Sequence, residues 1–147
     1  MPYTAVFIHV TFATFDRAPL ITPSLRPHLH AFLGGIARNI GCKPIEIGGV
    51  ADHAHALIEL NPKISISELV SKLKSNSSRW IREAEAHPAF NWQRGYGAFS
   101  VCPREVEKIR RYIREQEEHH RTRTFREEYI ELLEQSGVEF DPETCLR

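Results

Sequence analysis

The 147-residue sequence lacks several features that would place it in a special class of proteins. It has no apolar run of the roughly 18 to 20 residues that a membrane-spanning helix needs, and its first residues, MPYTAVFIHVTFAT, include no basic segment typical of an export signal. Its three cysteines, Cys42, Cys102 and Cys145, form no CxxC pair, which argues against a disulfide framework and a structural zinc knuckle. We therefore expect a cytoplasmic protein with no membrane segment.

The sequence also lacks an excess of charge of either sign. Nineteen Lys and Arg residues balance nineteen Asp and Glu residues, so no global positive field favours nucleic acid. Any site for a polyanion must then be local. The length is sufficient to bury a core, and we see no linker, internal repeat or low-complexity tract. We therefore expect a single domain over residues 1–147.

The strands are predicted from short runs that are rich in β-branched and aromatic residues. Turn residues bound four such runs, at 3–12, 42–50, 52–60 and 97–102. The pair Gly48-Gly49, near the end of the second run, predicts the turn of a hairpin that joins the second and third runs.

Helices are predicted between and after these strands. The first is expected over 22–41, with a threonine N-cap and a glycine stop, and the second opens at the capping box SISE over 65–68. Pro103 begins a third helix that runs through REVEKIRRYIREQEEHH. A last helix follows the N-cap Thr124, and we expect its acidic segment REEYIELLEQ to face solvent.

The order βαββαβ followed by two helices is typical of one fold class. It predicts an α+β, ferredoxin-like βαββαβ sandwich with an antiparallel sheet, whose helices pack on one sheet face. Within the single domain we expect a ferredoxin-like core over 1–102, a tyrosine-bearing helix over 103–121, and a C-terminal helix and tail over 122–147.

Two histidines alternate with alanines in the segment DHAHALIEL. In a strand, His53 and His55 would share one face, about 7 Å apart, and would project from the side that the helices leave open. The opposite face is wholly apolar, with Ala54, Ala56, Ile58 and Leu60. Two imidazoles in this arrangement can share one divalent metal, or they are simply half-exposed polar residues on a solvent face.

The segment RYIREQEEHH places two further functional groups on one helix. Tyr112 and Gln116 are four residues apart and so share a helical face, with His119 close to the same line. A phenol can act as a nucleophile, and an amide oxygen can bind a metal. Alternatively, Tyr112 belongs to an apolar core stripe and Gln116 is exposed.

Three segments in this order resemble a known family. DHAHALIEL is similar to the His-hydrophobe-His strand of the HUH nucleases, WQRGYGAFSV to the segment before their tyrosine helix, and RYIREQEEHH to that helix. Together, over about 3–133 of the chain, they resemble the single-tyrosine transposases of bacterial insertion sequences, the IS200-like transposase family, including relatives associated with repetitive extragenic palindromes.

The resemblance implies a site and a reaction. His53, His55 and Gln116 would bind Mg²⁺ or Mn²⁺, Tyr112 would be the nucleophile, and Glu59 and His119 are candidates for residues around them. Members of the family cleave and rejoin single-stranded DNA at hairpins through a 5′-phosphotyrosine. Most act as homodimers, in which the tyrosine helix of one subunit can complete the site of the other, and some act as monomers. We expect a homodimer or a monomer acting at the bacterial nucleoid.

A DNA substrate requires a local basic surface on this neutral chain. The helix after residue 65 predicts a basic strip opposite its apolar stripe, formed by Lys72, Ser75, Arg79 and Arg82. Two loops offer candidates for gripping or stacking on unpaired bases, Arg17, Trp92, Arg94 and Tyr96. Alternatively, the strip is an ordinary solvated helix face and the aromatic side chains belong to the core.

Two other functions fit parts of the pattern. A ferredoxin-like sheet with aromatics and a basic helix can be a non-catalytic nucleic-acid-binding protein, such as a domesticated relative, but a binder needs no tyrosine beside the histidine pair. A metal-dependent hydrolase of a small molecule could use the histidines with Glu59 and water, but this leaves RYIREQ unexplained. We therefore favour the transposase.

Overall fold

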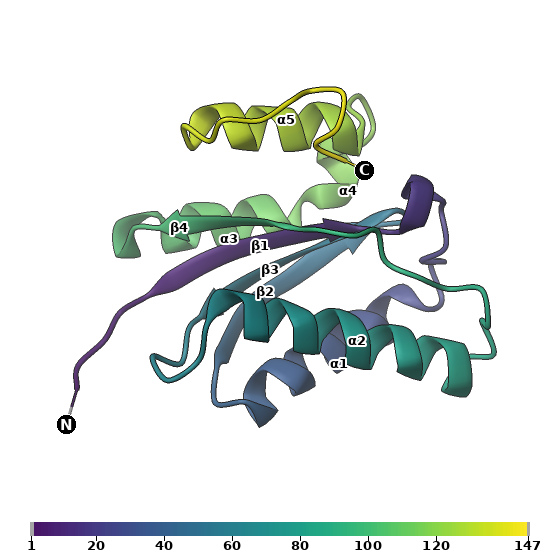
Figure 1. Cartoon of the computed structure of the whole chain (residues 1–147), viewed down its shortest axis with the longest axis horizontal. Helices are drawn as coiled ribbons and strands as arrows, with labels where there is room; N and C mark the ends of the chain where they lie inside the picture. The colour runs from purple at the N-terminus through teal and green to yellow at the C-terminus, as the bar shows by residue number, and fades with distance from the viewer. Residues whose placement is uncertain (1, 147) are drawn as a thin grey trace.

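The computed structural model describes residues 2–146 and shows a four-stranded sheet between two layers of helices (Figure 1). The strands are β1 (Phe7–Ala13), β2 (Lys43–Val50), β3 (His53–Glu59) and β4 (Gly97–Val101). They lie in the order β2-β3-β1-β4, and every neighbouring pair is antiparallel. The predicted α+β, ferredoxin-like βαββαβ sandwich is therefore confirmed.

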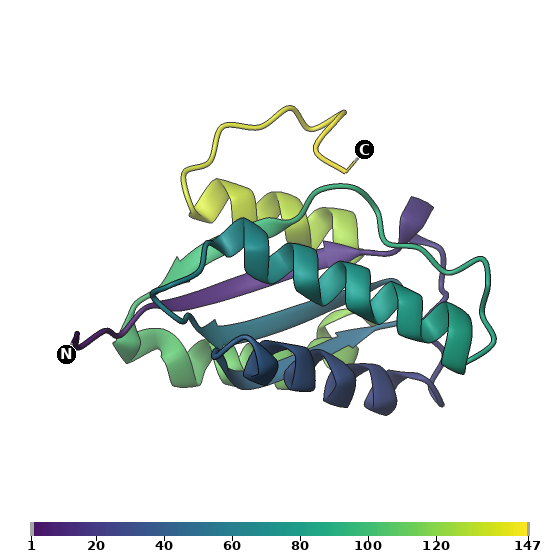
Figure 2. The same ribbon diagram turned by 60° about the horizontal axis from the view of Figure 1, so that its bottom comes forward.

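Helices α1 (Arg26–Asn39) and α2 (Ile66–Ala84) cover one face of the sheet (Figure 2). Ala54, Ala56 and Ile58 of β3 are buried in the hydrophobic cluster beneath them, as the alternation along the strand predicts. Ser65 caps α2, since its hydroxyl oxygen accepts a hydrogen bond of 3.0 Å from the backbone N–H of Glu68. The larger apolar core of the molecule lies between this pair of helices and the sheet.

Three short helices cover the other face, α3 (Val106–Arg114), α4 (Gln116–His119) and α5 (Phe125–Gln135), seen above the sheet in Figure 1. The predictions of helices on one face only, and of an open face for His53 and His55, are therefore wrong. Both histidines have an exposed fraction of 0%. Alternation distinguishes a polar face from an apolar one, but a polar face can also be buried when its groups find partners.

The helix predicted to run without interruption from Pro103 is divided. A 3-10 turn, η2 (Pro103–Glu105), precedes α3, and Glu115 separates α3 from α4 with φ −96° and ψ 22°. Helix α5 begins as predicted, because Thr124 and Glu127 form a reciprocal capping box. It ends at Gln135, with Ser136 as its C-cap, before Gly137 with a φ of 69°.

Two boundaries near β1 and α1 differ from the predictions. Strand β1 begins at Phe7 and is followed by the 3-10 turn η1 (Phe15–Arg17). Helix α1 begins at Arg26, four residues later than predicted, because Thr22 caps a turn: its hydroxyl oxygen accepts a hydrogen bond from the backbone N–H of Leu25. Within residues 2–146, none of the helices has the length and apolar character needed to cross a bilayer.

The predicted turn at Gly48-Gly49 is wrong, because both glycines lie within β2 and the chain turns at Ala51 and Asp52. A Cβ atom on Gly48 would lie 2.5 Å from the carbonyl oxygen of Ile113. Glycine is needed here because α3 packs directly against the strand. The contact fixes the distance between the sheet and the helix that carries Tyr112.

We expect Gly48→Ala to lower the free energy of unfolding by about 1 to 3 kcal/mol, because the added methyl group pushes α3 away from β2. Gly35→Ala is the matched control, since a Cβ there meets nothing within 4 Å and alanine is favoured in a helix. Urea unfolding followed by circular dichroism measures both. Equal stability of the two variants would contradict the close packing of α3.

Candidate active site

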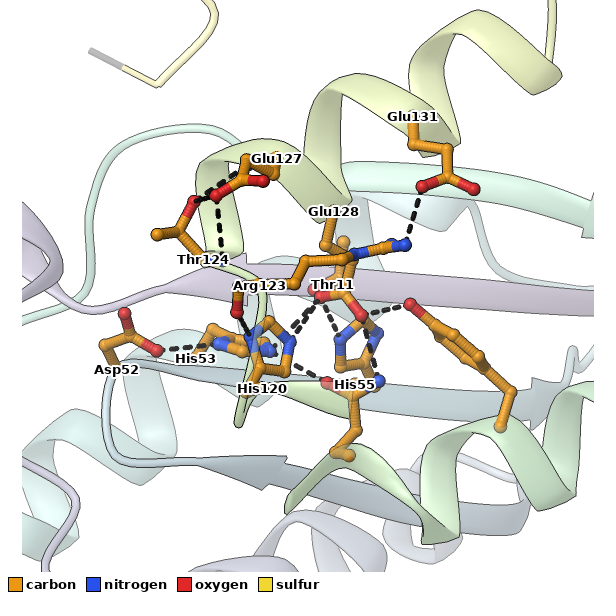
Figure 3. Close-up of polar contacts among 12 residues, drawn as sticks. Thr11, Asp52, His53, His55, His120, Arg123, Thr124, Glu127, Glu128 and Glu131 are labelled. Atoms are coloured by element: carbon orange, nitrogen blue, oxygen red, sulfur yellow. Dashed lines mark hydrogen bonds and ion pairs between the residues drawn. The ribbon is translucent and has the colours of Figure 1, made fainter. Parts of the chain in front are cut away.

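Strand β3 presents His53 and His55 to the layer formed by α3, α4 and α5, where a group of polar side chains is buried (Figure 3). The carboxylate of Glu128, from α5, lies at its centre and has an exposed fraction of 0%. Its Oε1 atom lies 3.3 Å from Nε2 of His53, 3.0 Å from Nε2 of His55 and 3.1 Å from Nε2 of His120. Three imidazoles thus surround one carboxylate oxygen.

The opposite nitrogen of each imidazole has a partner of its own. Nδ1 of His53 lies 2.7 Å from Oδ1 of Asp52, and Nδ1 of His120 lies 2.8 Å from the backbone carbonyl oxygen of Arg123. Since both of these oxygens are acceptors, both Nδ1 atoms carry hydrogen. Each partner orients its ring so that Nε2 faces the centre of the group.

His55 is held by a fourth histidine, His9. Its Nδ1 lies 2.7 Å from Nε2 of His9, a buried residue of β1. Burial lowers the pKa of His9 to about 3, so the His9 ring is neutral at physiological pH. A neutral His9 can donate a hydrogen bond from its Nε2–H to Nδ1 of His55, which leaves the Nε2–H of His55 to donate to Glu128.

Tyr112 and Gln116 approach the same carboxylate from α3 and α4. The Tyr112 hydroxyl donates a short hydrogen bond to Oε2 of Glu128, and the Gln116 amide donates another, of 2.9 Å, to the same atom. The amide oxygen of Gln116 lies 2.9 Å from Nε2 of His53. The four side chains predicted to form the site, His53, His55, Tyr112 and Gln116, therefore meet within one chain.

The group is strongly coupled electrostatically. Burial alone would raise the pKa of the Glu128 carboxyl, but hydrogen bonds from the imidazoles hold it well below its ordinary value. Burial lowers the pKa of His53, yet its bonds to Asp52 and Glu128 more than offset this and raise that pKa to about 9. Burial lowers the pKa of His55 to about 4. A cationic His53 thus lies between the carboxylates of Asp52 and Glu128.

The phenol of Tyr112 is held in its protonated form. Burial, reinforced by the hydrogen bond to Glu128, raises its pKa above the ordinary value of 10.0. Its ring borders a hollow of about 300 Å³ between α3 and α5, which His9, His119 and Arg123 also line. A substrate group can therefore approach Tyr112 from this hollow.

The group fits a divalent metal ion. Ligands about 2.0 to 2.2 Å from one ion, and at right angles to each other, are about 3 Å apart, which is close to the separations around Glu128. The ligand atoms of His53, His120 and Glu128 all lie within 4.8 Å of one another. Because all the histidine Nδ1 atoms are engaged elsewhere, the Nε2 atoms are the ones available to an ion.

The two residues proposed to lie around the ligands have different positions. His119 packs against Tyr112, with 4.7 Å between the ring centroids, and does not face Glu128 as its neighbour His120 does. Glu59 is at the far end of β3 from His53, in register with Phe7. Among residues 2–146, no hydrogen bond joins Glu59 to the group around Glu128.

The candidate DNA-contacting residues fall into separate regions. Trp92 is core, since its indole N–H donates to the hydroxyl of Ser77 and its ring packs on Phe12. The strip on α2 is on the layer opposite Tyr112, and it includes the exposed side chains of Lys72, Ser75, Arg79 and Arg82. Arg94 and Tyr96 are exposed in the loop before β4 and line a hollow beside α2. Arg17 is exposed in η1.

Four residues of the group were not anticipated from the sequence: His9, Asp52, His120 and Glu128. The expectation that the acidic segment of α5 faces solvent is wrong for Glu128, although Glu127, Glu131 and Glu134 do lie on accessible faces. The helical period offered one signal: Glu128 is three residues after Phe125 and one before Tyr129, both buried.

Comparison with known proteins identifies the family. The family model described as "Transposase IS200 like" matches residues 3–116 of the chain. The chain belongs to the IS200-like transposase family. Among curated proteins, this transposase is 29% identical over 114 residues to the transposase for insertion sequence element IS200 from Salmonella typhimurium, and likewise to that from Salmonella typhi, with 74% of each chain covered.

Two solved structures share the fold of this IS200-like transposase. A putative transposase from Deinococcus radiodurans R1 aligns with a TM-score of 0.62 and 24% identity, over 79% of this chain and 95% of that one. A REP-associated tyrosine transposase bound to a REP hairpin also aligns with a TM-score of 0.62, at 13% identity, over 82% of this chain and 72% of that one. His120 and Glu128 lie beyond the residues that the family model matches.

We expect Glu128→Gln, measured in chelator, to lower the free energy of unfolding at neutral pH by about 3 to 5 kcal/mol, because it breaks a buried ion pair. The folded-state pKa of Glu128 lies below the ordinary value of 4.5, so its contribution is present above that pH and is lost as the pH falls. The difference between the two proteins should therefore narrow in acid.

Glu134→Gln, on the exposed side of the same helix, is the control and should change stability by less than about 0.5 kcal/mol. Urea titrations from neutral to acid pH measure all three proteins. A difference between wild type and Glu128→Gln that does not change with pH would rule out the charged carboxylate as its source.

Proposed function

We propose that this IS200-like transposase cleaves and rejoins single-stranded DNA at hairpin-bearing sites, through a 5′-phosphotyrosine on Tyr112 and with a divalent metal ion. One observation carries the proposal: the Tyr112 hydroxyl and the Nε2 atoms of His53 and His55 face the same buried carboxylate. A protein that only binds nucleic acid needs no such convergence. Because the substrate would be chromosomal DNA, we expect it to act at the nucleoid.

The reaction conserves the energy of the phosphodiester. The phenolic oxygen of Tyr112 attacks the scissile phosphorus, a phosphorus–oxygen bond to tyrosine forms, and the bond to the 3′ oxygen breaks. The 3′ oxygen leaves as a hydroxyl after it takes up a proton. When a 3′-hydroxyl attacks the phosphotyrosine, the same steps run in reverse and release Tyr112. Strand joining therefore needs no nucleotide cofactor.

Glu128 positions the nucleophile. Its Oε2 atom accepts the hydrogen bond from the Tyr112 hydroxyl and so orients the phenolic oxygen, and because the pKa of Glu128 is low, the proton passes on to solvent as the new bond forms. The amide of Gln116 donates to the same oxygen and so fixes its position between the two side chains. The proton, the nucleophile and the histidine pair are thereby held in one arrangement before substrate enters.

We propose that Mg²⁺ or Mn²⁺ is held by His53, His55 and Gln116, and that His120 and Glu128 complete the set. Their mixture of imidazole nitrogen and carboxyl or amide oxygen suits such an ion. Bound there, the ion would neutralise negative charge on the scissile phosphate and so favour attack by a phenol of high pKa.

One chain supplies every part of this site. We infer that the tyrosine helix acts in cis, since α3 packs on β2 of its own chain through Gly48. The segment from Ser100 to Pro103 leads from β4 directly into η2 and α3. A homodimer in which each subunit keeps its own tyrosine would supply the two cleavages that excision of an element requires, whereas a monomer would make one.

We expect wild-type protein, incubated with hairpin-bearing single-stranded DNA and Mn²⁺, to form a covalent adduct that survives a denaturing gel. Tyr112→Phe should form none, because phenylalanine has no oxygen to attack phosphorus. Tyr96→Phe is the matched control and should retain the adduct, since Tyr96 lies outside the group around Glu128. Equal adduct from wild type and Tyr112→Phe would exclude Tyr112 as the nucleophile.

We expect His55→Ala to bind Mn²⁺ at least about tenfold more weakly than wild type in isothermal titration calorimetry. Wild type should also gain about 2.7 kcal/mol of stability when Mn²⁺ is at about one hundred times its dissociation constant. Tyr112→Phe serves as control, because its Mn²⁺ affinity should stay within about threefold of wild type. If His55→Ala bound the ion as tightly as wild type, the metal site would have to lie elsewhere.

A further inference from the structure

A second hollow, of about 750 Å³, adjoins the active site on the side away from Tyr112. It is bordered by η1, the start of α1, the turn between β2 and β3, and the loop that leads into α5. This arginine groove, as we call it, takes its charge from four side chains: Arg17, Arg26, Arg121 and Arg123. No basic cluster of this kind is evident from the order of residues, because three separate segments contribute to it.

Positive charge in the groove exceeds negative charge. Its acidic residues are Asp52, whose carboxylate is engaged by His53, and Glu117. Among residues 2–146, neither Arg17 nor Arg26 takes part in an ion pair, and Nε of Arg26 is buried with no hydrogen-bond partner. The pair that Arg121 forms with Glu118 is largely exposed and therefore weak. The groove is thus suited to an anionic ligand.

The groove is continuous with the catalytic group. His120 lines the groove and at the same time lies 3.1 Å from Glu128. Arg123 borders both the groove and the hollow next to Tyr112. In Figure 3, Arg123 lies over the imidazoles and extends toward Glu131, with which it forms an ion pair of 2.6 Å. A chain of phosphates that reached Tyr112 could therefore continue past His120 into the groove.

We propose that the arginine groove binds the sugar-phosphate backbone of single-stranded DNA on one side of the scissile phosphate. This rests on the proposed nuclease function, which requires an unpaired strand to pass through the site. Guanidinium groups bind phosphate oxygens through paired hydrogen bonds, so Arg17, Arg26 and Arg121 can neutralise successive phosphates. Arg123 keeps its ion pair with Glu131 and borders the path between the groove and Tyr112. The groove also explains how a chain with no net charge can hold a polyanion.

The basic strip on α2 makes a direct contrast possible. Lys72 and Arg79 are exposed like Arg17 and Arg121, but they lie on the layer opposite Tyr112. Arg17→Glu/Arg121→Glu and Lys72→Glu/Arg79→Glu change the net charge of the protein equally. Any difference in DNA affinity between these two double variants therefore reports on which side of the protein the single-stranded DNA binds. Circular dichroism confirms that each variant remains folded.

The test is fluorescence anisotropy with a labelled oligothymidine strand, over a range of salt concentrations. We expect Arg17→Glu/Arg121→Glu to bind at least about tenfold more weakly than wild type. The slope of log affinity against log salt should become shallower by about 1.4, because each phosphate contact to a single strand contributes about 0.7. Lys72→Glu/Arg79→Glu should lose less than about threefold. Arg17→Gln/Arg121→Gln should fall between wild type and the charge reversal.

Two outcomes would overturn the groove as the strand-binding site: equal losses in both charge-reversed variants, or a groove variant that binds within about threefold of wild type. The nuclease proposal is judged separately by the Mn²⁺-dependent adduct of wild type with hairpin DNA. Selective loss of binding without any wild-type adduct would leave the groove as a DNA-binding site and reject the nuclease. If wild type forms the adduct but the groove variant shows no selective loss of binding, the nuclease proposal stands and the groove is rejected as the strand-binding site.

Discussion

The buried carboxylate of Glu128 is the interaction on which the rest of the site depends. A charge with no exposure is stable only when hydrogen bonds and opposite charge surround it, and here imidazoles, an amide and a phenol provide them. These partners come from β3, α3, α4 and the segment before α5. One acidic side chain thereby fixes the relative positions of four elements, and with them the distance between the nucleophile and the histidine pair.

The sheet separates two kinds of interior. On the side of α1 and α2 the contacts are apolar and tolerate exchanges of similar volume. On the other side, small apolar clusters flank the polar group, one around Ile113 and Leu57 and one around Phe125 and Tyr129. These clusters hold α3 and α5 against the sheet, while the polar group between them determines how the helices are aligned.

Local pattern predicts some parts of this molecule and not others. The N-cap at Ser65, the capping box at Thr124 and the alternation in β3 depend on neighbours in the sequence, and these were predicted correctly, although Glu68 does not complete the box predicted at Ser65. Glu128 was not predicted correctly, because an acidic helix resembles a solvent face until its distant imidazole partners are known. The turn predicted at Gly48 was wrong for a related reason. A glycine that is needed because a helix packs close to the strand looks the same in the sequence as a glycine in a turn.

The two-sided burial of β3 has a consequence for how the family can vary. Because its alternate residues serve opposite faces, a single inserted or deleted residue would turn both imidazoles into the apolar core and bring the alanines to Glu128. The strand can therefore exchange side chains but cannot change length. The exposed segment between α2 and Phe90 has no such constraint. Length variation among related chains should accumulate there and be absent between Asp52 and Leu60.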